Sequence, residues 1–234
     1  MQPKTNKVES DLPKPILFNE NLKTAEELPE NALYLFDKPS GISSFGAVHQ
    51  LRTRLRDVHG KKVKVGHCGT LDPLATGLLI LVSGKLTKRA GELTKMDKAY
   101  EAEATLGSSS STYDSEGELT PVSTKKPSST EVKTQLHKFS GKIQQTPPAF
   151  SAIKIGGKRA YKLAREGKEV KIDPREVEIY SIELIKYAYP KIQFRVHVSS
   201  GTYIRSIIDD LGKNLGVGAH MSALRRTSIG KYKL

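Results

Sequence analysis

One short segment of the chain has the composition of a catalytic loop. In Gly66–Gly77 (G-H-C-G-T-L-D-P-L-A-T-G), three glycines and a proline surround a single acid, Asp72, directly before an apolar run. Because Asp72 precedes Pro73, its backbone is driven toward an extended conformation and does not continue a helix. The glycines let another backbone approach closely. Such a carboxylate can act as a nucleophile or a general base, although an isolated Asp-Pro pair is more often only a turn.

The chain carries a strong positive charge. Its formal net charge is +13 and its pI is about 9.7. A cluster of six cations with only Asp57 among them consists of Arg52, Arg54, Arg56, Lys61, Lys62 and Lys64. Such a run is commonly a solvated helix face, but a surface that faces phosphate groups better explains the scarcity of acids. Nucleic acid is the commonest partner of such a protein, and composition alone also fits a basic protein without one.

Two other classes of protein do not fit the sequence. No apolar run approaches the roughly 20 residues that span a bilayer, and the N-terminus lacks the apolar core of a signal peptide. The single cysteine, Cys68, provides neither a disulfide within one chain nor a cysteine-based zinc site. We therefore expect a cytoplasmic protein.

The pattern of apolar residues predicts the elements that position these side chains. Residues 1–30 are polar and slightly acidic, which predicts a flexible tail, and residues 31–234 should form one catalytic domain. The predicted strands are Ala32–Asp37, Gly77–Val82, Tyr100–Leu106 and two more within Glu176–Tyr187 and Lys191–Val198. Loops are expected at Gly107–Gly117 and Gln144–Gly157.

Helices are predicted from their caps and spacing. The first begins at Ser43 or Ser44 and should bury Phe45, Val48, Leu51 and Leu55. Others start at the capping box Ser128–Glu131, near Lys158, and at Ser200 or Thr202, the last ending at Gly216. Together the elements predict an α/β domain with a mixed sheet.

Segments along nearly the whole ordered chain resemble one enzyme family. The segment around Asp72 resembles the catalytic motif of the tRNA pseudouridine synthase B (TruB) family, and further segments resemble that family in the same order. These form five further motifs: Asp37–Phe45; Lys98–Tyr100 with Leu106–Gly107 and Thr112–Gly117; Thr146–Lys154 with Gly157–Tyr161; Ser200–Ser206; and Leu224–Gly230. One such match is weak evidence, whereas six in register over residues 32–230 are very specific.

The resemblance implies a fold, a reaction and its catalytic residues. The fold is the pseudouridine-synthase type, an α/β (α+β) domain with a mixed, largely antiparallel sheet, flanking helices and a central RNA-binding cleft. The reaction isomerises the uridine at position 55, in the tRNA T loop, to pseudouridine without a metal or other cofactor. Asp72 matches the catalytic aspartate, Arg205 the arginine that pairs with it, and Tyr100 the tyrosine that stacks on the flipped base.

The resemblance and the charge also predict residues that bind RNA. His67 matches a histidine that holds the RNA loop open by stacking, Lys38 and Pro39 match a basic-loop motif beside the active site, and Thr146–Glu176 matches a mobile loop that clamps RNA. The predicted RNA-binding residues are Lys38, Pro39, His67, Arg52, Arg56, Lys61, Lys62, Lys154, Lys158, Arg159 and Tyr203.

Plainer explanations exist for several of these residues. Without the resemblance, Tyr100 is a half-buried strand tyrosine, His67 a turn histidine bonded to backbone, and Arg205 a helix cation bound to solvent or phosphate. A cation at a helix N-terminus opposes the helix dipole, however, so the placement of Arg205 suggests an acidic partner nearby.

The expected partner is tRNA, bound through its T-arm stem-loop by a monomeric enzyme without membrane contact. Many bacterial members of the family carry a C-terminal RNA-binding PUA domain, and the sequence to Leu234 leaves no room for one. Two rival hypotheses are a non-catalytic RNA-binding protein and a metal-dependent nuclease or phosphotransferase. The presence of both Asp72 and Arg205 argues against the first, and the lack of a convincing metal constellation argues against the second.

Overall fold

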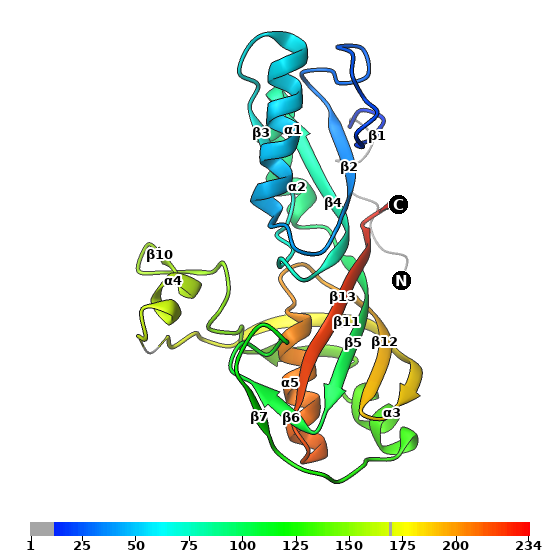
Figure 1. Ribbon diagram of the computed structural model, residues 1–234. Helices are drawn as coiled ribbons and strands as arrows, with labels where there is room; N and C mark the ends of the chain where they lie inside the picture. The colour runs from blue at the N-terminus through cyan, green and yellow to red at the C-terminus, as the bar shows by residue number, and fades with distance from the viewer. Residues whose placement is uncertain (1–11, 169) are drawn as a thin grey trace. The chain divides into compact units, whose positions relative to one another are not determined.

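The computed structural model describes residues 12–168 and 170–234, which divide into two units (Figure 1). The first unit lies within Met1–Met96 and Arg225–Leu234, and the second is Asp97–Leu224. The strands are β1 Ile16–Leu17, β2 Leu33–Lys38, β3 Val65–His67, β4 Thr76–Ser83, β5 Lys98–Leu106, β6 Ser108–Ser110, β7 Leu119–Pro121, β8 Gly141–Gln145, β9 Lys154–Ile155, β10 Lys158–Arg159, β11 Arg175–Ala188, β12 Lys191–Val198, β13 Ala219–Ile229 and β14 Tyr232–Lys233. The helices are α1 Ser44–His59, the 3-10 helix η2 Gly84–Arg89, α2 Ala90–Thr94, α3 Ser129–His137, α4 Ala160–Arg165 and α5 Ile204–Leu215.

The first unit is a mixed sheet centred on β4. Strand β2 pairs with β4 in antiparallel orientation, and β1 pairs with β2 in parallel. The opposite edge of β4 pairs with β3 and, at Thr76 and Gly77, with the last part of β13. Every residue of β4 after Thr76 is buried, which is the expected state of an apolar central strand. The catalytic loop predicted around Asp72 therefore leads directly into the middle of this sheet.

Helix α1 differs from the prediction at its first turn. Ser43 is the N-cap, as predicted, and its Oγ accepts a hydrogen bond from the Gly46 N–H at 3.0 Å. Phe45, predicted to be buried, is instead 64% exposed, and Ser44 occupies the buried position. One residue along an α-helix is a rotation of about 100°, so only one of these two neighbours can face the core.

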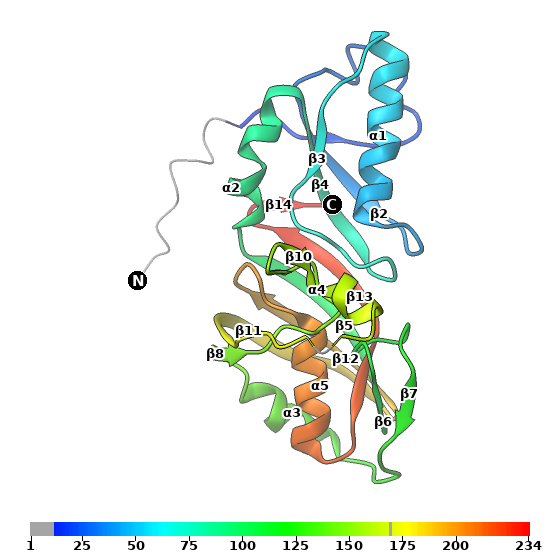
Figure 2. The ribbon, with the colours of Figure 1, turned by 90° about the vertical axis from the view of Figure 1, so that its left-hand side faces the viewer.

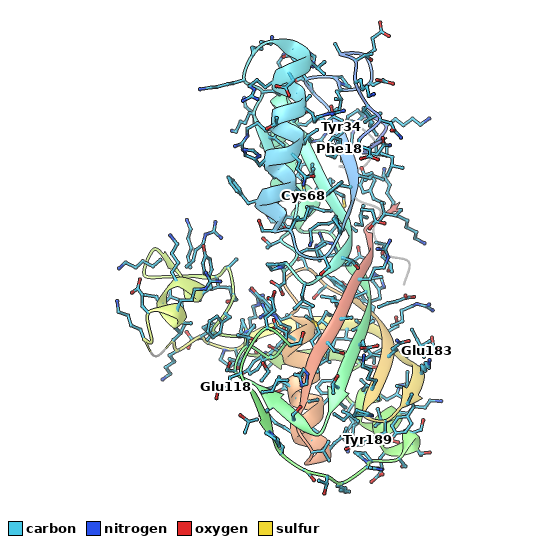
Figure 3. All side chains as sticks on the ribbon, in the orientation of Figure 1. Phe18, Tyr34, Cys68, Glu118, Glu183 and Tyr189 are labelled. Atoms are coloured by element: carbon cyan, nitrogen blue, oxygen red, sulfur yellow. The ribbon has the colours of Figure 1, made fainter. Side chains whose placement is uncertain are left out.

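The predicted flexible tail, residues 1–30, lies partly outside the described residues. From residue 12 onward the segment packs on the first unit, because β1 pairs with β2 and the side chains of Phe18 and Leu28 are buried. The Phe18 ring meets the Tyr34 ring edge-on at a centroid distance of 6.2 Å (Figure 3). The structure thus differs from the prediction here, since a few spaced apolar side chains suffice to cover a sheet edge despite a polar average composition.

The second unit is built on a sheet whose strand order is β13, β5, β12, β11 and β8. The pairs β5–β12, β12–β11 and β11–β8 are antiparallel. Helices α3 and α5 lie side by side on one face of this sheet (Figure 2). With the first unit, these pairings confirm the predicted mixed, largely antiparallel α/β fold. The predicted loop Gly107–Gly117 also contains the short strand β6, which pairs with β7.

A segment between β8 and β11 stands away from the sheet of the second unit, as Figure 1 shows. It holds the hairpin of β9 and β10 and the helix α4. Gly156 and Gly157 form the hairpin turn with φ values of +55° and +82°, which residues with a Cβ rarely adopt. We refer to residues 146–174 as the flap.

Candidate active site

The loop that carries Asp72 connects β3 to β4 within the first unit. Asp72 is half-buried, and its carbonyl accepts a hydrogen bond from the Ala75 N–H at 3.1 Å, which closes a turn directly after the acid. Where the loop enters β4, Gly77 has a φ of +94°, and a Cβ added there would lie 2.3 Å from the Arg226 carbonyl oxygen. The glycine is therefore required by close backbone approach, as its place in the segment suggested.

Hydrogen bonds hold the residues on both sides of Asp72. The Ser44 hydroxyl accepts a hydrogen bond from the Leu71 N–H at 2.8 Å and lies 2.9 Å from the Leu71 carbonyl, to which it donates. On the other side, the Pro73 carbonyl accepts hydrogen bonds from the Gly41 N–H at 3.0 Å and the Lys38 ammonium at 3.1 Å. These contacts fix the backbone around Asp72 without using its carboxylate.

Lys38 is fully buried, with 0% of its surface exposed. Its Nζ donates to the carbonyls of Pro39 and Ile42, both at 2.8 Å, and of Pro73. Burial leaves this ammonium no surface for the RNA contact predicted from sequence, and its bonds make it a structural support of the catalytic loop. Pro39 is exposed, so an RNA contact by Pro39 stays a prediction.

We expect the substitution Lys38→Met to destabilise the protein. Methionine matches the length of the side chain but donates no hydrogen bond, so three carbonyls lose a charged donor in a buried place. At roughly 1–3 kcal/mol for each unsatisfied group, with partial relaxation, the free energy of unfolding should fall by about 3 kcal/mol. Urea unfolding measures it, with the exposed Lys62→Met as the matched control. A loss below about 1 kcal/mol would show that the bonds are dispensable.

Arg226 reaches the catalytic loop from β13. Its side chain is the largest fully buried one, at 1% exposure. The Nε donates to the Leu78 carbonyl at 2.7 Å, and Nη2 donates to the Gly69 carbonyl at 3.1 Å. The guanidinium therefore links the loop before Asp72 to the strand after it. Sequence reasoning assigned Arg226 no role, because nothing in its local pattern distinguishes it from an exposed arginine.

Arg205 lies at the first turn of α5 in the second unit and is 5% exposed. Its Nη1 donates to the Asp114 carboxylate at 3.1 Å and to the Thr112 carbonyl at 3.0 Å. Its Nη2 donates to the Phe150 carbonyl at 2.9 Å. The acidic partner expected from the helix dipole is thus present in this unit, and it is Asp114. Pairing of Arg205 with Asp72 stays a prediction.

Asp114 is a buried ion-pair partner of Arg205 to which the sequence analysis assigned no role, although its segment Thr112–Gly117 was matched to the family. It is 2% exposed, and its Oδ1 accepts hydrogen bonds from the Thr112 hydroxyl and, at 3.1 Å, from the Glu116 N–H. The segment is tight, because a Cβ on Gly117 would lie 2.4 Å from the Thr112 Oγ1. The signal in the sequence that could have singled out Asp114 was an acid three residues before a glycine in a short loop.

Tyr113, directly before Asp114, is the one non-glycine residue among those described with a positive φ, at 66°. Burial raises the pKa of its phenol, and the nearby Asp209 carboxylate raises it further, so the ring stays neutral. The Lys213 ammonium lies 5.7 Å from the centroid of this ring. A left-handed residue costs of order 1 kcal/mol or more. Here it turns the chain so that Asp114 faces Arg205.

We expect Asp114→Asn to remove the ion pair that holds the Arg205 guanidinium in place, while Arg205 itself stays in the protein. Asparagine keeps the shape of the side chain but removes the negative charge beside a buried guanidinium. Loss of one partner of a buried ion pair costs roughly 3 kcal/mol of folding stability, and we also expect kcat to fall at least about tenfold. Chemical unfolding and turnover of the expected uridine substrate should be measured together, with the exposed acid-to-amide change Glu183→Gln as the control. Unchanged values of both would remove Asp114 from the site.

The start of α5 is tied to the base of the flap. The amide of Gln145, which is 1% exposed, accepts from the Tyr203 N–H at 2.8 Å and donates to the Tyr203 carbonyl at 3.0 Å. The Ser206 hydroxyl donates to the Thr146 carbonyl at 2.9 Å. Tyr203 itself is the N-cap, not Ser200 or Thr202 as predicted. Through these bonds the backbone near Arg205 has a fixed place relative to residues 145–150.

Of the other aromatic residues predicted to act on RNA, Tyr100 and His67 occupy strands and Tyr203 caps α5. Tyr100 lies on β5 and is 7% exposed, and His67 ends β3 and is half-buried. The ring of Tyr203 is half-buried and carries the Arg175 guanidinium 5.2 Å from its centroid. Contact of these three rings with RNA stays a prediction.

The cations of α1 and the following loop divide into two groups. Lys61 pairs with Glu30 at 2.7 Å, Arg56 pairs with its exposed neighbour Asp57 at 3.1 Å, and Arg54 donates to two backbone carbonyls of the N-terminal segment. Arg52 and Lys62 make no such ion pair within the described chain. Exposed pairs contribute little, about 0–1 kcal/mol, so RNA phosphates can replace the partners of Arg56 and Lys61.

The flap hairpin gathers exposed cations. Arg159 pairs with Lys154 across the hairpin, and Lys158 lies beside them next to the turn. All three side chains are exposed, and the nitrogen ends of the side chains on this segment point away from the ribbon in Figure 3. The structure therefore brings together the three flap cations predicted from sequence.

Neither a metal site nor a membrane helix is found in the part of the chain that the structure describes. There is no group of three or more His, Cys, Asp or Glu side chains able to hold a metal ion, and no helix is long and apolar enough to cross a membrane.

Comparison with known proteins matches most of this chain. The family model "TruB family pseudouridylate synthase (N terminal domain)" matches residues 56–204, and "tRNA pseudouridylate synthase B C-terminal domain" matches residues 205–234. Curated relatives named tRNA pseudouridine synthase B include one from Flavobacterium johnsoniae, 43% identical over 89% of this chain and 93% of its own length. Another, from Bacteroides fragilis, is 45% identical over 88% of this chain and 89% of its own.

Solved structures also match most of the chain, at lower sequence identity. A crystal structure of a Cbf5–Nop10–Gar1 complex matches 93% of this chain with a TM-score of 0.66 and 28% identity. A structure of an H/ACA RNP bound to a substrate RNA containing 2'-deoxyuridine matches 92% with a TM-score of 0.63 and 26% identity. The chain spans 58% and 55% of these two structures' chains.

Fold, loop and matches together define a pseudouridine synthase, an isomerase that moves the glycosidic bond of uridine from nitrogen to carbon. Within that class, the chain belongs to the TruB family.

Proposed function

We propose that this enzyme isomerises the uridine at position 55, in the T loop of tRNA, and that Asp72 is its catalytic carboxylate. The observation that carries the proposal is the catalytic loop, in which both neighbours of Asp72 are fixed by hydrogen bonds to buried side chains. Such support holds a reacting group in one geometry. The curated relatives, named as tRNA enzymes and 42–45% identical, support the choice of substrate.

The proposed reaction needs one carboxylate and no redox partner. The N1–C1′ bond of uridine breaks, the uracil turns, and a C5–C1′ bond forms, after which the proton on C5 leaves and N1 is protonated. Asp72 acts either as the nucleophile at the sugar or as the base in this sequence. In our proposal, Arg205 orients the Asp72 carboxylate and keeps it ionised. Tyr100 stacks on the flipped uracil.

RNA binding is proposed to use seven cations and three further residues. Six of the cations are exposed, and Arg52 is half-buried. The cations are Arg52, Arg56, Lys61, Lys62, Lys154, Lys158 and Arg159. His67, Pro39 and Tyr203 are proposed to contact the RNA loop near the target uridine. We propose a monomer that acts in the cytoplasm, in keeping with a sequence that contains a single cysteine.

The decisive experiment compares two RNAs in one assay. Tritium release from 5-[³H]-uridine is measured with intact tRNA and with a hairpin that carries only the T arm, and the modified position is then mapped. We expect modification at position 55, with kcat/KM for the hairpin within about tenfold of that for tRNA, a difference of about 1.4 kcal/mol. A product elsewhere in the tRNA, or no product at all, would overturn the proposed substrate. A hairpin deficit of about a thousandfold would show that recognition extends beyond the T arm.

A further inference from the structure

Helix α1 exposes an aromatic side chain that its fold does not require. Phe45 is 64% exposed, while Ser44, Ala47, Val48, Leu51 and Leu55 make the buried face. The ring thus adds nothing to the core of the first unit. One exposed phenylalanine is common in proteins and needs no explanation by itself. Its surroundings make this one informative.

Phe45 begins a stripe of cationic and aromatic side chains along α1. Phe45, His49, Arg52 and Arg56 follow one another at intervals of four, three and four residues, which places them on one face of the helix. The Arg52 guanidinium lies 5.8 Å from the centroid of the Phe45 ring, a cation–π distance. We call these four residues the α1 stripe. An aromatic ring flanked by cations is the combination that binds unpaired nucleotides, whose bases stack while their phosphates need positive charge.

The α1 stripe begins beside the catalytic loop. Ser44, the residue before Phe45, bonds both the N–H and the carbonyl of Leu71, the residue before Asp72. Further along the stripe, the Arg52 Nη2 lies 3.5 Å from the Val65 carbonyl of β3, the strand that leads into this loop. The stripe therefore runs along the edge of the first unit from which the catalytic loop projects. All of these contacts lie within the first unit.

We propose that Phe45 is a stacking site for an RNA base that neighbours the target uridine, with Arg52 and Arg56 on the adjoining phosphates. The inference rests on the proposed function for its substrate. When the target uridine is flipped out, its neighbours lose stacking partners, and an exposed ring at the edge of the catalytic loop replaces one of them. The positive charge of the stripe favours RNA over a protein partner, since Asp57 is the one acid within α1.

Cross-linking and binding test the proposal directly. T-arm hairpins carrying 5-iodouridine on either side of the target uridine are irradiated with the full chain, and the linked peptide is identified by mass spectrometry. We expect a cross-link to Phe45 in the wild-type protein and none in Phe45→Ala. In parallel, Phe45→Ala should weaken hairpin binding about tenfold, or 1.4 kcal/mol. Phe45→Trp should bind within about twofold of wild type, because it keeps a stacking face.

The control is Ile185→Ala, which removes another exposed apolar side chain, 48% exposed on β11. It should leave binding unchanged. The rate of a saturated single turnover should change less than about threefold in Phe45→Ala, since the ring binds RNA but does not take part in bond changes. Hairpin affinity within twofold of wild type for Phe45→Ala, or an equal loss for Ile185→Ala, would overturn the proposal. A Phe45 cross-link in an RNA that the wild-type enzyme never modifies would refute the proposed function and leave this contact standing.

Discussion

The substitution Asp72→Asn is expected to abolish pseudouridine formation while the protein keeps its fold. Asparagine has the shape of aspartate but is neither a base nor a useful nucleophile. The hydrogen bonds that hold the loop use the backbone of Leu71 and Pro73 and the carbonyl of Asp72, so they survive the change. We expect kcat to fall by more than about 10⁴-fold, which corresponds to roughly 5 kcal/mol of barrier.

Three measurements make this test of Asp72 specific. Tritium release gives turnover, hairpin binding should remain within about threefold of wild type, and urea unfolding should show an intact fold. Glu183→Gln, an exposed acid-to-amide change on β11, is the matched control and should be fully active. Turnover of Asp72→Asn within about tenfold of wild type, or about 1.4 kcal/mol, would show that another group carries the chemistry.

The second large effect is expected from Arg205→Lys, although the charge is kept. The guanidinium of Arg205 uses Nη1 for Thr112 and Asp114 and Nη2 for Phe150, so its two ends serve different partners at once. A lysine ammonium is a single point of charge and cannot span them. We expect kcat to fall by about 10²-fold or more, near 3 kcal/mol of barrier.

Arg195→Lys, on an exposed strand position, is the control for Arg205→Lys and should behave as wild type. Separate measurements of kcat and of RNA affinity decide whether Arg205 acts in the reaction, in RNA binding or in the fold alone. A loss of RNA affinity with normal kcat would mean that Arg205 binds an RNA phosphate, which is the alternative role given to it in the sequence analysis. Wild-type values of both would show that its buried contacts serve the fold alone.

The sequence by itself determined the features that follow from local pattern. The apolar run of β4, the Ser43 cap of α1, the capping box of α3 and the glycine that ends α5 at Gly216 all occur where they were predicted. The loop around Asp72 also leads directly into β4, as predicted, whereas the short strand β3 before it was not predicted. Each signal extends over a few neighbouring residues, and caps and apolar periodicity act at that range.

Strand β13 shows where local pattern fails. Its residues Ala219–Ile229 include two adjacent arginines, and the alternation of apolar and polar residues stops after Ala223, so the sequence analysis predicted no strand there. It becomes a strand because β4 and β5 lie beside it and supply hydrogen-bond partners. The cost of burying Arg226 is offset by the carbonyls of Gly69 and Leu78, which are distant in sequence.

Only the tertiary structure decided which charged side chains belong to the scaffold and which to the surface. The side chains of Lys38 and Arg226 can be buried because backbone carbonyls accept their hydrogen bonds. Asp114 can be buried because its carboxylate forms an ion pair with Arg205. Phe45 is exposed because Ser44 takes the place facing the core. The partner of a polar group decides whether its burial is tolerated, and these partners come from other parts of the chain. The resemblance to the family assigned a chemical role to the loop around Asp72, which is our proposal, whereas long-range hydrogen bonds alone revealed what holds this loop in place.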